Sequence, residues 1–96
     1  MSIIRLVHMT YPAETANEAA ESWKKNRGPL MSEQPGCQSE ELLRCSDVPT
    51  EFVSYSVWDD EDCVRHYLES AAYHRIREEN RQKGATHVTV RLYDKV

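Results

Sequence analysis

Aromatic, hydroxyl and imidazole side chains gather in two stretches of this 96-residue chain, at 52–58 and at 66–74. A histidine with its ordinary pKa near ~6.5 is the natural base at neutral pH. The histidine candidates are His8, His66 and His74. Large rings can wall an apolar pocket, and the candidates are Trp23, Trp58, Tyr67 and Tyr73. Ser54 and Ser56 are small and leave room above a sheet. Together these residues could remove a proton from a ligand held in an aromatic box.

Each of these residues also has an ordinary structural interpretation, which stays open at this point. The tryptophans and tyrosines are equally suited to a packed core with their polar atoms hydrogen-bonded. His66 falls opposite the apolar positions of its segment, which indicates a solvated surface residue. His8 shares parity with Ile4 and Leu6, which indicates an interface residue, and His74 could lie at a rim.

Composition restricts the class of protein. The chain is expected to form one domain over 1–96, since 40% of its residues are apolar and these cluster periodically. Its net charge of −4 and the absence of a Lys/Arg block argue against nucleic acid as a partner. No apolar run is long enough to span a bilayer, and residues 1–20 do not resemble a signal peptide. The three cysteines match no zinc spacing, which favours free thiols in the cytoplasm. No cofactor and no metal are expected.

Hydrophobic periodicity predicts two helices and four strands. The strands are expected at 3–10, 38–45, 52–58 and 86–93. The first helix should open at Pro12 and stop at Gly28-Pro29, with a further turn at 30–34. The second should be capped by Asp59 or Asp60, bend or restart at Ser70 and end at Gly84.

The order β-α-β-β-α-β predicts an α+β, ferredoxin-like sandwich. Right-handed crossovers would make the first and third strands central and parallel neighbours, with both helices on one face. The opposite face then carries five apolar or aromatic side chains, Ile4, Leu6, Val53, Tyr55 and Val57. Leaving them in water would forfeit ~1.5–3 kcal/mol each. We therefore expect a homodimer in which two copies pack sheet against sheet.

The chain resembles the antibiotic biosynthesis monooxygenase family of dimeric α+β barrel proteins over nearly its whole length. The most specific features are Pro35-Gly36-Cys37, the strand that ends in Trp58, the acidic helix start after it, and Leu68-x-Ser70-x-x-Tyr73. The resemblance implies a dimeric α/β barrel with a cavity between sheet and helices in each protomer. It also implies a cofactor-independent monooxygenase that oxidises a small aromatic, phenolic or quinol-type compound with O2.

The family's functional positions carry over to this chain one by one. Trp58 matches the family's strand-ending Trp, and Ser54 stands where the polyketide oxygenases have an Asn. The haem-degrading branch has Asn, Trp and His at the positions of Val7, Tyr67 and Arg77, so three departures argue against haem breakdown. The alternative is a non-catalytic ligand-binding or regulatory dimer.

The resulting expectation for the site has two parts. The catalytic residues are His74, Trp58 and Tyr67. The substrate-binding residues are Ser54, Ser56, Tyr73, Trp23 and Val7.

Overall fold

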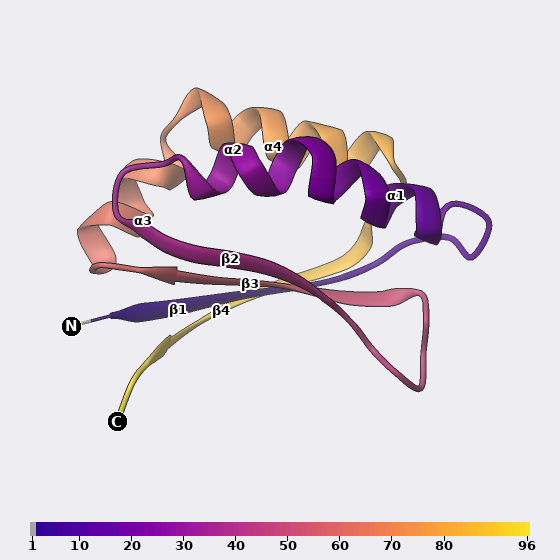
Figure 1. Cartoon of the computed structure of the whole chain (residues 1–96), viewed down its shortest axis with the longest axis horizontal. Coiled ribbons are helices and arrows are strands. Elements are labelled where there is room, and N and C mark those ends of the chain that lie inside the picture. The colour runs from indigo at the N-terminus through magenta and orange to yellow at the C-terminus, as the bar shows by residue number, and fades with distance from the viewer. Residues whose placement is uncertain (1) are drawn as a thin grey trace.

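A four-stranded antiparallel sheet carries every helix on one of its faces (Figure 1). The computed structural model describes residues 2–96. The strands are β1 (Ile3–Thr10), β2 (Cys37–Arg44), β3 (Glu51–Trp58) and β4 (Thr86–Asp94). The helical segments are α1 (Ala16–Ser22), η1 (Trp23–Arg27), α2 (Gly28–Ser32), α3 (Glu61–Leu68) and α4 (Ala71–Gln82). This arrangement confirms the predicted ferredoxin-like fold.

The strand order is β2-β3-β1-β4, so β3 and β1 are central as predicted. The predicted parallel pairing of these two strands was wrong, because β1 pairs antiparallel with β3 from Ile3↔Trp58 to Thr10↔Glu51. The reason lies in the hairpin. The first helical crossover leaves one strand position free between β1 and β2, and the hairpin brings β3 back into that position. A strand that returns through a hairpin must run antiparallel to its neighbours.

The predicted helix stop at Gly28-Pro29 was also wrong, because the helix continues through η1 into α2 and ends at Ser32. Pro29 has no N–H to donate, and it comes directly after the π-type turn of η1, where the regular helical hydrogen-bond pattern is already interrupted. The N–H of Gly28 donates to Trp23 O across a wider π-type turn. A side chain at Gly28 would place its Cβ 2.8 Å from Glu40 Oε2, so any other residue there would force the Glu40 side chain to move.

The two caps predicted for the second half of the chain are confirmed. The Asp60 carboxylate accepts a hydrogen bond from the Cys63 N–H at 2.9 Å and begins α3. The Ser70 hydroxyl accepts one from the Tyr73 N–H at 3.1 Å and begins α4. Each cap satisfies a backbone donor that the first helical turn leaves free. The break at Ser70 therefore fixes the direction of Tyr73 relative to Tyr67.

Alternating burial on the central strands confirms the predicted faces of the sheet. Odd-numbered residues of β1 and even-numbered residues of β3 point toward the helices and are buried. The helix-free face carries Ile4, Leu6, Val53, Tyr55 and Val57, and all five side chains are half-buried in the single chain. Cys37, Cys45 and Cys63 are free thiols. None of the helices in residues 2–96 has the length and apolar character needed to cross a membrane.

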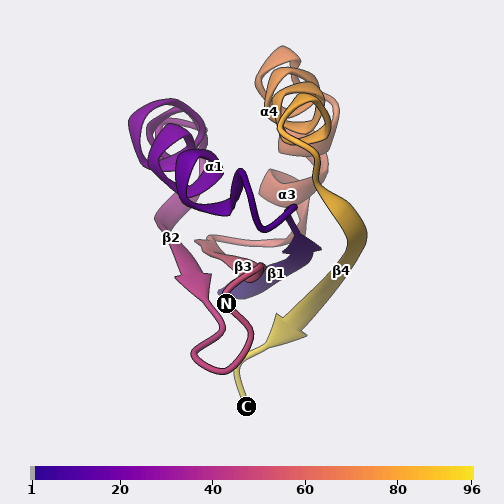
Figure 2. The same cartoon turned by 90° about the vertical axis from the view of Figure 1, so that its right-hand side faces the viewer.

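The edge strand β4 curves away from the helices, as Figure 2 shows. Its Val90 pairs with Val7 and its Leu92 with Arg5, so both lie on the helix-bearing face of the sheet. Val88, Val90 and Leu92 nevertheless remain 53%, 50% and 45% exposed. Because α4 does not cover these side chains, a gap lined by Val88 and Val90 remains between α4 and β4.

Candidate functional site

A cavity of about 80 Å³ lies between the helix-bearing face of the sheet and α3 and α4. We call it the inner cavity. It is lined by Arg5, Val7, Met9, Trp23, Met31, Ser54, Tyr67, Tyr73, Ile76, Arg77, Asn80, Val88 and Val90. Five of the sequence-predicted site residues are in this set: Val7, Trp23, Ser54, Tyr67 and Tyr73. The structure therefore brings together residues of both strands and of the second helical segment.

Tyr67 is held at the centre of an aromatic cluster. Its ring stacks on Trp58 with the centroids 4.9 Å apart and meets Tyr73 edge to face at 5.4 Å. The Tyr67 hydroxyl is buried and has no hydrogen-bond partner among residues 2–96. Burial raises the pKa of Tyr67 to about 12, although the nearby Arg5 opposes this shift. The phenol is therefore protonated at neutral pH, where it can donate a hydrogen bond but cannot act as a base.

Trp58 and Ser56 lie behind the wall of the inner cavity rather than in it. The Trp58 Nε1–H donates to Ser56 Oγ at 2.9 Å, and Ser56 Oγ donates to Arg5 O at 3.4 Å. Both side chains are fully buried, and neither is part of the cavity lining. Because Trp58 stacks directly on Tyr67, this pair fixes the position of the Tyr67 ring.

Ser54 and Arg5 are polar groups that line the cavity without partners. Ser54 is 1% exposed, and its Oγ has no hydrogen-bond partner within the described chain. Arg5 is 4% exposed, its guanidinium lies over the rings of Tyr67 and Tyr73, and its Nε also lacks a partner. Burial lowers the pKa of Arg5, and the two tyrosines oppose this shift. Because Arg5 pairs with Ser56 and Val7 with Ser54, Arg5 and Ser54 are diagonal neighbours on one face of the sheet.

The three candidate histidines lie outside the inner cavity. His74 is exposed on α4, with its ring 5.6 Å from that of Tyr73, and it lines the gap between α4 and β4. His66 is exposed on α3, and His8 is exposed on the helix-free face of the sheet. His74 is therefore the histidine that can exchange protons with a ligand at the cavity entrance.

The gap beside His74 is an open groove of about 690 Å³, which we call the α4–β4 groove. It shares part of its wall with the inner cavity. The shared residues are Tyr73, Arg77, Asn80, Val88 and Val90. The inner cavity and the α4–β4 groove therefore adjoin each other along these five residues.

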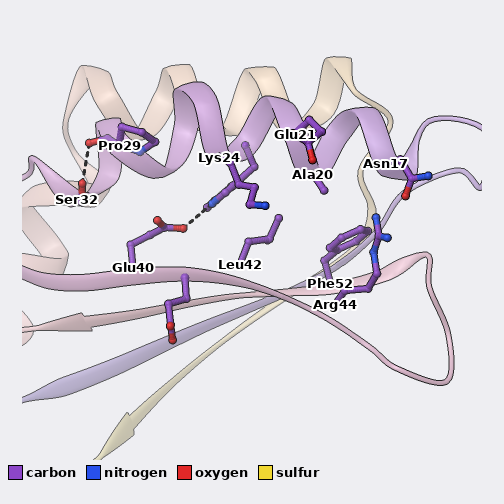
Figure 3. A pocket seen from close by; sticks show the side chains of 12 residues that line it. Asn17, Ala20, Glu21, Lys24, Pro29, Ser32, Glu40, Leu42, Arg44 and Phe52 are labelled. Carbon is purple, nitrogen blue, oxygen red and sulfur yellow. Dashed lines mark hydrogen bonds between the residues drawn. The ribbon is translucent and has the colours of Figure 1, made fainter.

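A second open groove, of about 770 Å³, lies on the other side of Trp23 between α1–α2 and β2. Figure 3 shows Glu40 and Leu42 rising from β2 toward the helix, with Arg44 beside Phe52. The Trp23 Nε1–H donates to a Glu40 carboxylate oxygen, and burial raises the pKa of Glu40. Trp23 is thus a shared wall between this groove and the inner cavity.

Sequence reasoning missed several cavity residues, of which Arg5 is the most important for chemistry. A charged residue at a helix-facing position of a central strand was the signal that could have identified it. Arg77 was considered only as the counterpart of a histidine in the haem-degrading branch, whereas the structure places it in the cavity lining together with Asn80, Val88 and Val90. In the described part of the chain, no group of three or more His, Cys, Asp or Glu side chains could hold a metal ion.

Comparison with known proteins identifies the family. The sequence matches the family described as "Antibiotic biosynthesis monooxygenase" over residues 2–79. The chain belongs to this family, as its resemblance implied. No curated protein matches the chain.

Solved structures with the same fold have low sequence identity. SnoaB, a cofactor-independent oxygenase from Streptomyces nogalater, is 22% identical with a TM-score of 0.84, over 99% of this chain and 93% of SnoaB. A conserved protein from Methanosarcina mazei is 14% identical with a TM-score of 0.87, over 100% and 94% of the two chains. A conserved protein of unknown function from Bacteroides thetaiotaomicron is 13% identical with a TM-score of 0.84, over 98% and 97%. At these identities the similarity establishes the fold alone.

Proposed function

We propose that the protein is a cofactor-independent monooxygenase that oxidises a small phenolic or quinol-type aromatic compound with O2. One observation carries this proposal: the inner cavity combines apolar and aromatic walls with the unpartnered hydroxyls of Ser54 and Tyr67. Such a site can exclude water from an aromatic ring while it binds the oxygen atom of that ring. Membership of the monooxygenase family and the oxygenase activity named for SnoaB support the reaction class.

The chemistry is a four-electron oxidation that needs no external reductant. A dihydroxynaphthalene, C10H8O2, reacts with O2 to give a hydroxynaphthoquinone, C10H6O3, and H2O. One oxygen atom enters the product and the other becomes water, and the substrate supplies all four electrons. The protein must favour the phenolate, which is the electron-rich form that reacts with O2, and must keep it in a dry site.

The residues have the following proposed roles. Tyr67, protonated at neutral pH, donates a hydrogen bond to the substrate oxygen, and Ser54 donates a second. Tyr73, Trp23 and Val7 form walls that contact the oxygen-bearing edge of the ring. His74, at the groove, accepts the proton that the substrate releases.

Trp58 and Ser56 act through Tyr67 rather than on the substrate, since they support its ring from behind. They are positioning residues in this proposal.

A homodimer through the helix-free face is part of the proposal. Ile4, Leu6, Val53, Tyr55 and Val57 are half-buried there, and Leu6 is directly opposite Tyr55. A second copy would cover them and remove this apolar area from water. Sedimentation should give twice the mass of one chain, and Leu6→Glu should give a single chain, whereas Leu68→Glu on α3 should not. A folded single chain of the wild type at micromolar concentration would refute the dimer.

A second candidate function is non-catalytic binding of the same class of ligand. It is favoured by the absence of a histidine from the inner-cavity lining among residues 2–96. In that case the site would hold the ligand without promoting its reaction with O2.

Oxygen uptake distinguishes the two functions. Wild-type protein should accelerate O2 consumption by 1,4-dihydroxynaphthalene or an anthrone above the no-protein rate. Tyr67→Phe and His74→Ala should lower the rate, and Trp58→Phe should lower it by disturbing Tyr67. His66→Ala is the matched control, because His66 is an exposed histidine away from the cavity. A wild-type rate equal to the no-protein rate would refute the monooxygenase and leave the binding function.

A further inference from the structure

Arg5 is a buried cation for which the described chain supplies no counter-ion. It is 4% exposed, and none of the ion pairs found among residues 2–96 includes it. Its Nε donates to nothing in the same part of the structure. A charged side chain that is removed from water is costly unless it is paired. The missing partner is therefore a property of the site that requires an explanation.

The surroundings of Arg5 leave one side of its guanidinium available. Its Cζ lies 5.5 Å from the ring centroid of Tyr67 and 5.9 Å from that of Tyr73. These contacts compensate part of the lost hydration through the faces of the rings. They satisfy none of its N–H donors, and its Nε has no acceptor in residues 2–96. Arg5 is also one of the residues that line the inner cavity.

Two further donors converge on the same cavity. The Ser54 hydroxyl and the Tyr67 hydroxyl are both buried and both without partners in residues 2–96. All three groups can donate a hydrogen bond, and Arg5 Nε, Ser54 Oγ and the Tyr67 hydroxyl are without a partner in residues 2–96, although each hydroxyl could also accept one. An anionic oxygen is the ligand group that suits such a set best, because hydrogen bonds to a charged oxygen are stronger than neutral ones.

The size of the cavity limits what can enter. At about 80 Å³ it is smaller than the roughly 150 Å³ that accommodates a benzene molecule. It can admit the oxygen-bearing edge of an aromatic ring, while the remainder of the ring lies in the α4–β4 groove. The apolar side chains of Val88 and Val90 and the ring of Tyr73 line both spaces and suit an aromatic body.

We propose that the inner cavity is an oxyanion-binding site in which Arg5, with Ser54 and Tyr67, binds the ionised oxygen of a phenolate whose ring extends into the α4–β4 groove. This inference rests on the proposed function for the choice of a phenolate among oxyanions, and it adds the residue that selects the ionised form. The ligand loses its proton to the solvent or to His74 on binding, and no bond to carbon changes. Arg5 thereby makes the phenol more acidic inside the protein than in water.

The test uses 4-nitrophenol without O2, because its phenolate absorbs visible light and its phenol form does not. Wild-type protein should shift the ionisation of the bound probe downward by about one pH unit or more, which corresponds to a tenfold preference for the anion. Arg5→Met should abolish this shift and weaken phenolate binding about 10- to 100-fold. Arg5→Lys, which retains the charge, should recover part of the affinity.

Three controls make the result specific. The neutral ether 4-nitroanisole should bind wild type and Arg5→Met with the same affinity within about twofold, since it depends on the apolar walls. Arg44→Met removes one positive charge outside the cavity and should leave phenolate binding unchanged. Arg77→Met removes the exposed arginine at the cavity entrance and should weaken binding less than Arg5→Met. A circular dichroism spectrum of each variant verifies that it is folded.

The outcomes separate this inference from the proposed function. Equal binding of 4-nitrophenolate by wild type and Arg5→Met, no binding by wild type, or tighter binding of 4-nitroanisole than of the phenolate would each refute the oxyanion site. If one of these results accompanies normal oxygen uptake, the site is wrong and the monooxygenase stands. Phenolate binding that depends on Arg5 without any oxygen uptake would support the site and refute the monooxygenase.

Discussion

The two buried arginines of residues 2–96, Arg5 on β1 and Arg27 at the end of η1, are in opposite circumstances. Arg27 is 1% exposed, and its terminal nitrogens donate to Glu79 Oε2 and to Ala19 O, each at 2.9 Å. It also lies over the Trp23 ring at 5.3 Å. Arg5 is 4% exposed and lies over two tyrosine rings, but residues 2–96 provide it with neither a carboxylate nor a carbonyl. The Nε is unpaired in both side chains.

The difference between the two side chains indicates that the charge of Arg27 has a structural role and that of Arg5 a functional one. Arg27 connects η1 to α4 through Glu79, so its charge is compensated within the fold. Arg5 lines the inner cavity and takes part in none of the ion pairs of residues 2–96, so its charge is not compensated within the fold. Binding sites commonly sacrifice stability in this way, because a ligand must complete the interactions that the protein leaves open. Ser56 and Ser54 repeat the contrast, since Ser56 is bonded to Trp58 and Ser54 has no partner in the described chain.

The largest expected effect is on the structural side of the comparison. Arg27→Met should lower the free energy of unfolding by about 3 kcal/mol, because it leaves the partly buried Glu79 carboxylate and the Ala19 carbonyl without their donor. Urea denaturation measures this change. The matched control is Arg81→Met, which removes an exposed arginine paired with Glu78 and should leave stability unchanged. Equal effects of the two substitutions would show that the buried pair has no special role.

The next largest effect is a loss of stability at alkaline pH that is caused by Tyr67 in the inner cavity. The pKa of Tyr67 is raised from 10.0 to about 12, so the folded state holds this proton more tightly than the unfolded state. Its contribution to stability is complete below pH ~10 and is lost as the pH rises from about 10 to 12, by about 2–3 kcal/mol in total. Urea titrations across this window should show a steeper loss for wild type than for Tyr67→Phe.

Tyr93→Phe provides the control for the alkaline experiment, because Tyr93 is 46% exposed in the single chain and pairs with Ile4 on the helix-free face, away from the cavity. We expect the free energy of unfolding of Tyr93→Phe to vary with pH as that of the wild type does. A Tyr67→Phe curve parallel to the wild-type curve would contradict the buried, unpaired state of the Tyr67 hydroxyl.

A smaller pair of effects compares the two serines of β3. Ser56→Ala should cost about 2 kcal/mol, because it leaves the buried Trp58 Nε1–H without an acceptor. Ser54→Ala should stay within about 0.5 kcal/mol of the wild type, since the hydroxyl that it removes has no partner in residues 2–96. Thermal or urea unfolding of both variants measures the contrast. A larger loss for Ser54→Ala would mean that its hydroxyl is satisfied within the fold.

Much of the fold could be predicted because it depends on local patterns. Period-two burial on β1 and β3 and the capping residues Asp60 and Ser70 are readable in the sequence, and the structure confirms them. The continuous helix across Pro29 was missed because proline normally interrupts the hydrogen bonds of a helix, and the π-type turn at Trp23–Arg27 that precedes it is not visible in the sequence. The direction of β3 relative to β1 follows from the hairpin rather than from composition.

The site was less predictable because it depends on curvature and on unpaired groups. Nothing in the alternation of Val88, Val90 and Leu92 indicates that β4 would bend away from α4 and open a groove. Arg5 was overlooked inside an apolar strand, although its parity places it with Val7 on the buried face. The predicted aromatic residues Trp23, Tyr67 and Tyr73 do line the cavity. Trp58 and Ser56 instead form a hydrogen bond with each other behind the cavity wall, which sequence spacing alone does not reveal.

The account is tested most directly by the unfolding free energy of Arg5→Met with and without 4-nitrophenol. Without the ligand, this variant should be about 1 kcal/mol more stable than the wild type, because an unpaired buried cation is replaced by an apolar side chain. At a ligand concentration 100 times the wild-type dissociation constant, the wild type should gain about 2.7 kcal/mol and the variant at most about 1.4 kcal/mol. An Arg5→Met protein that is less stable than the wild type and is stabilised equally by the ligand would contradict the account.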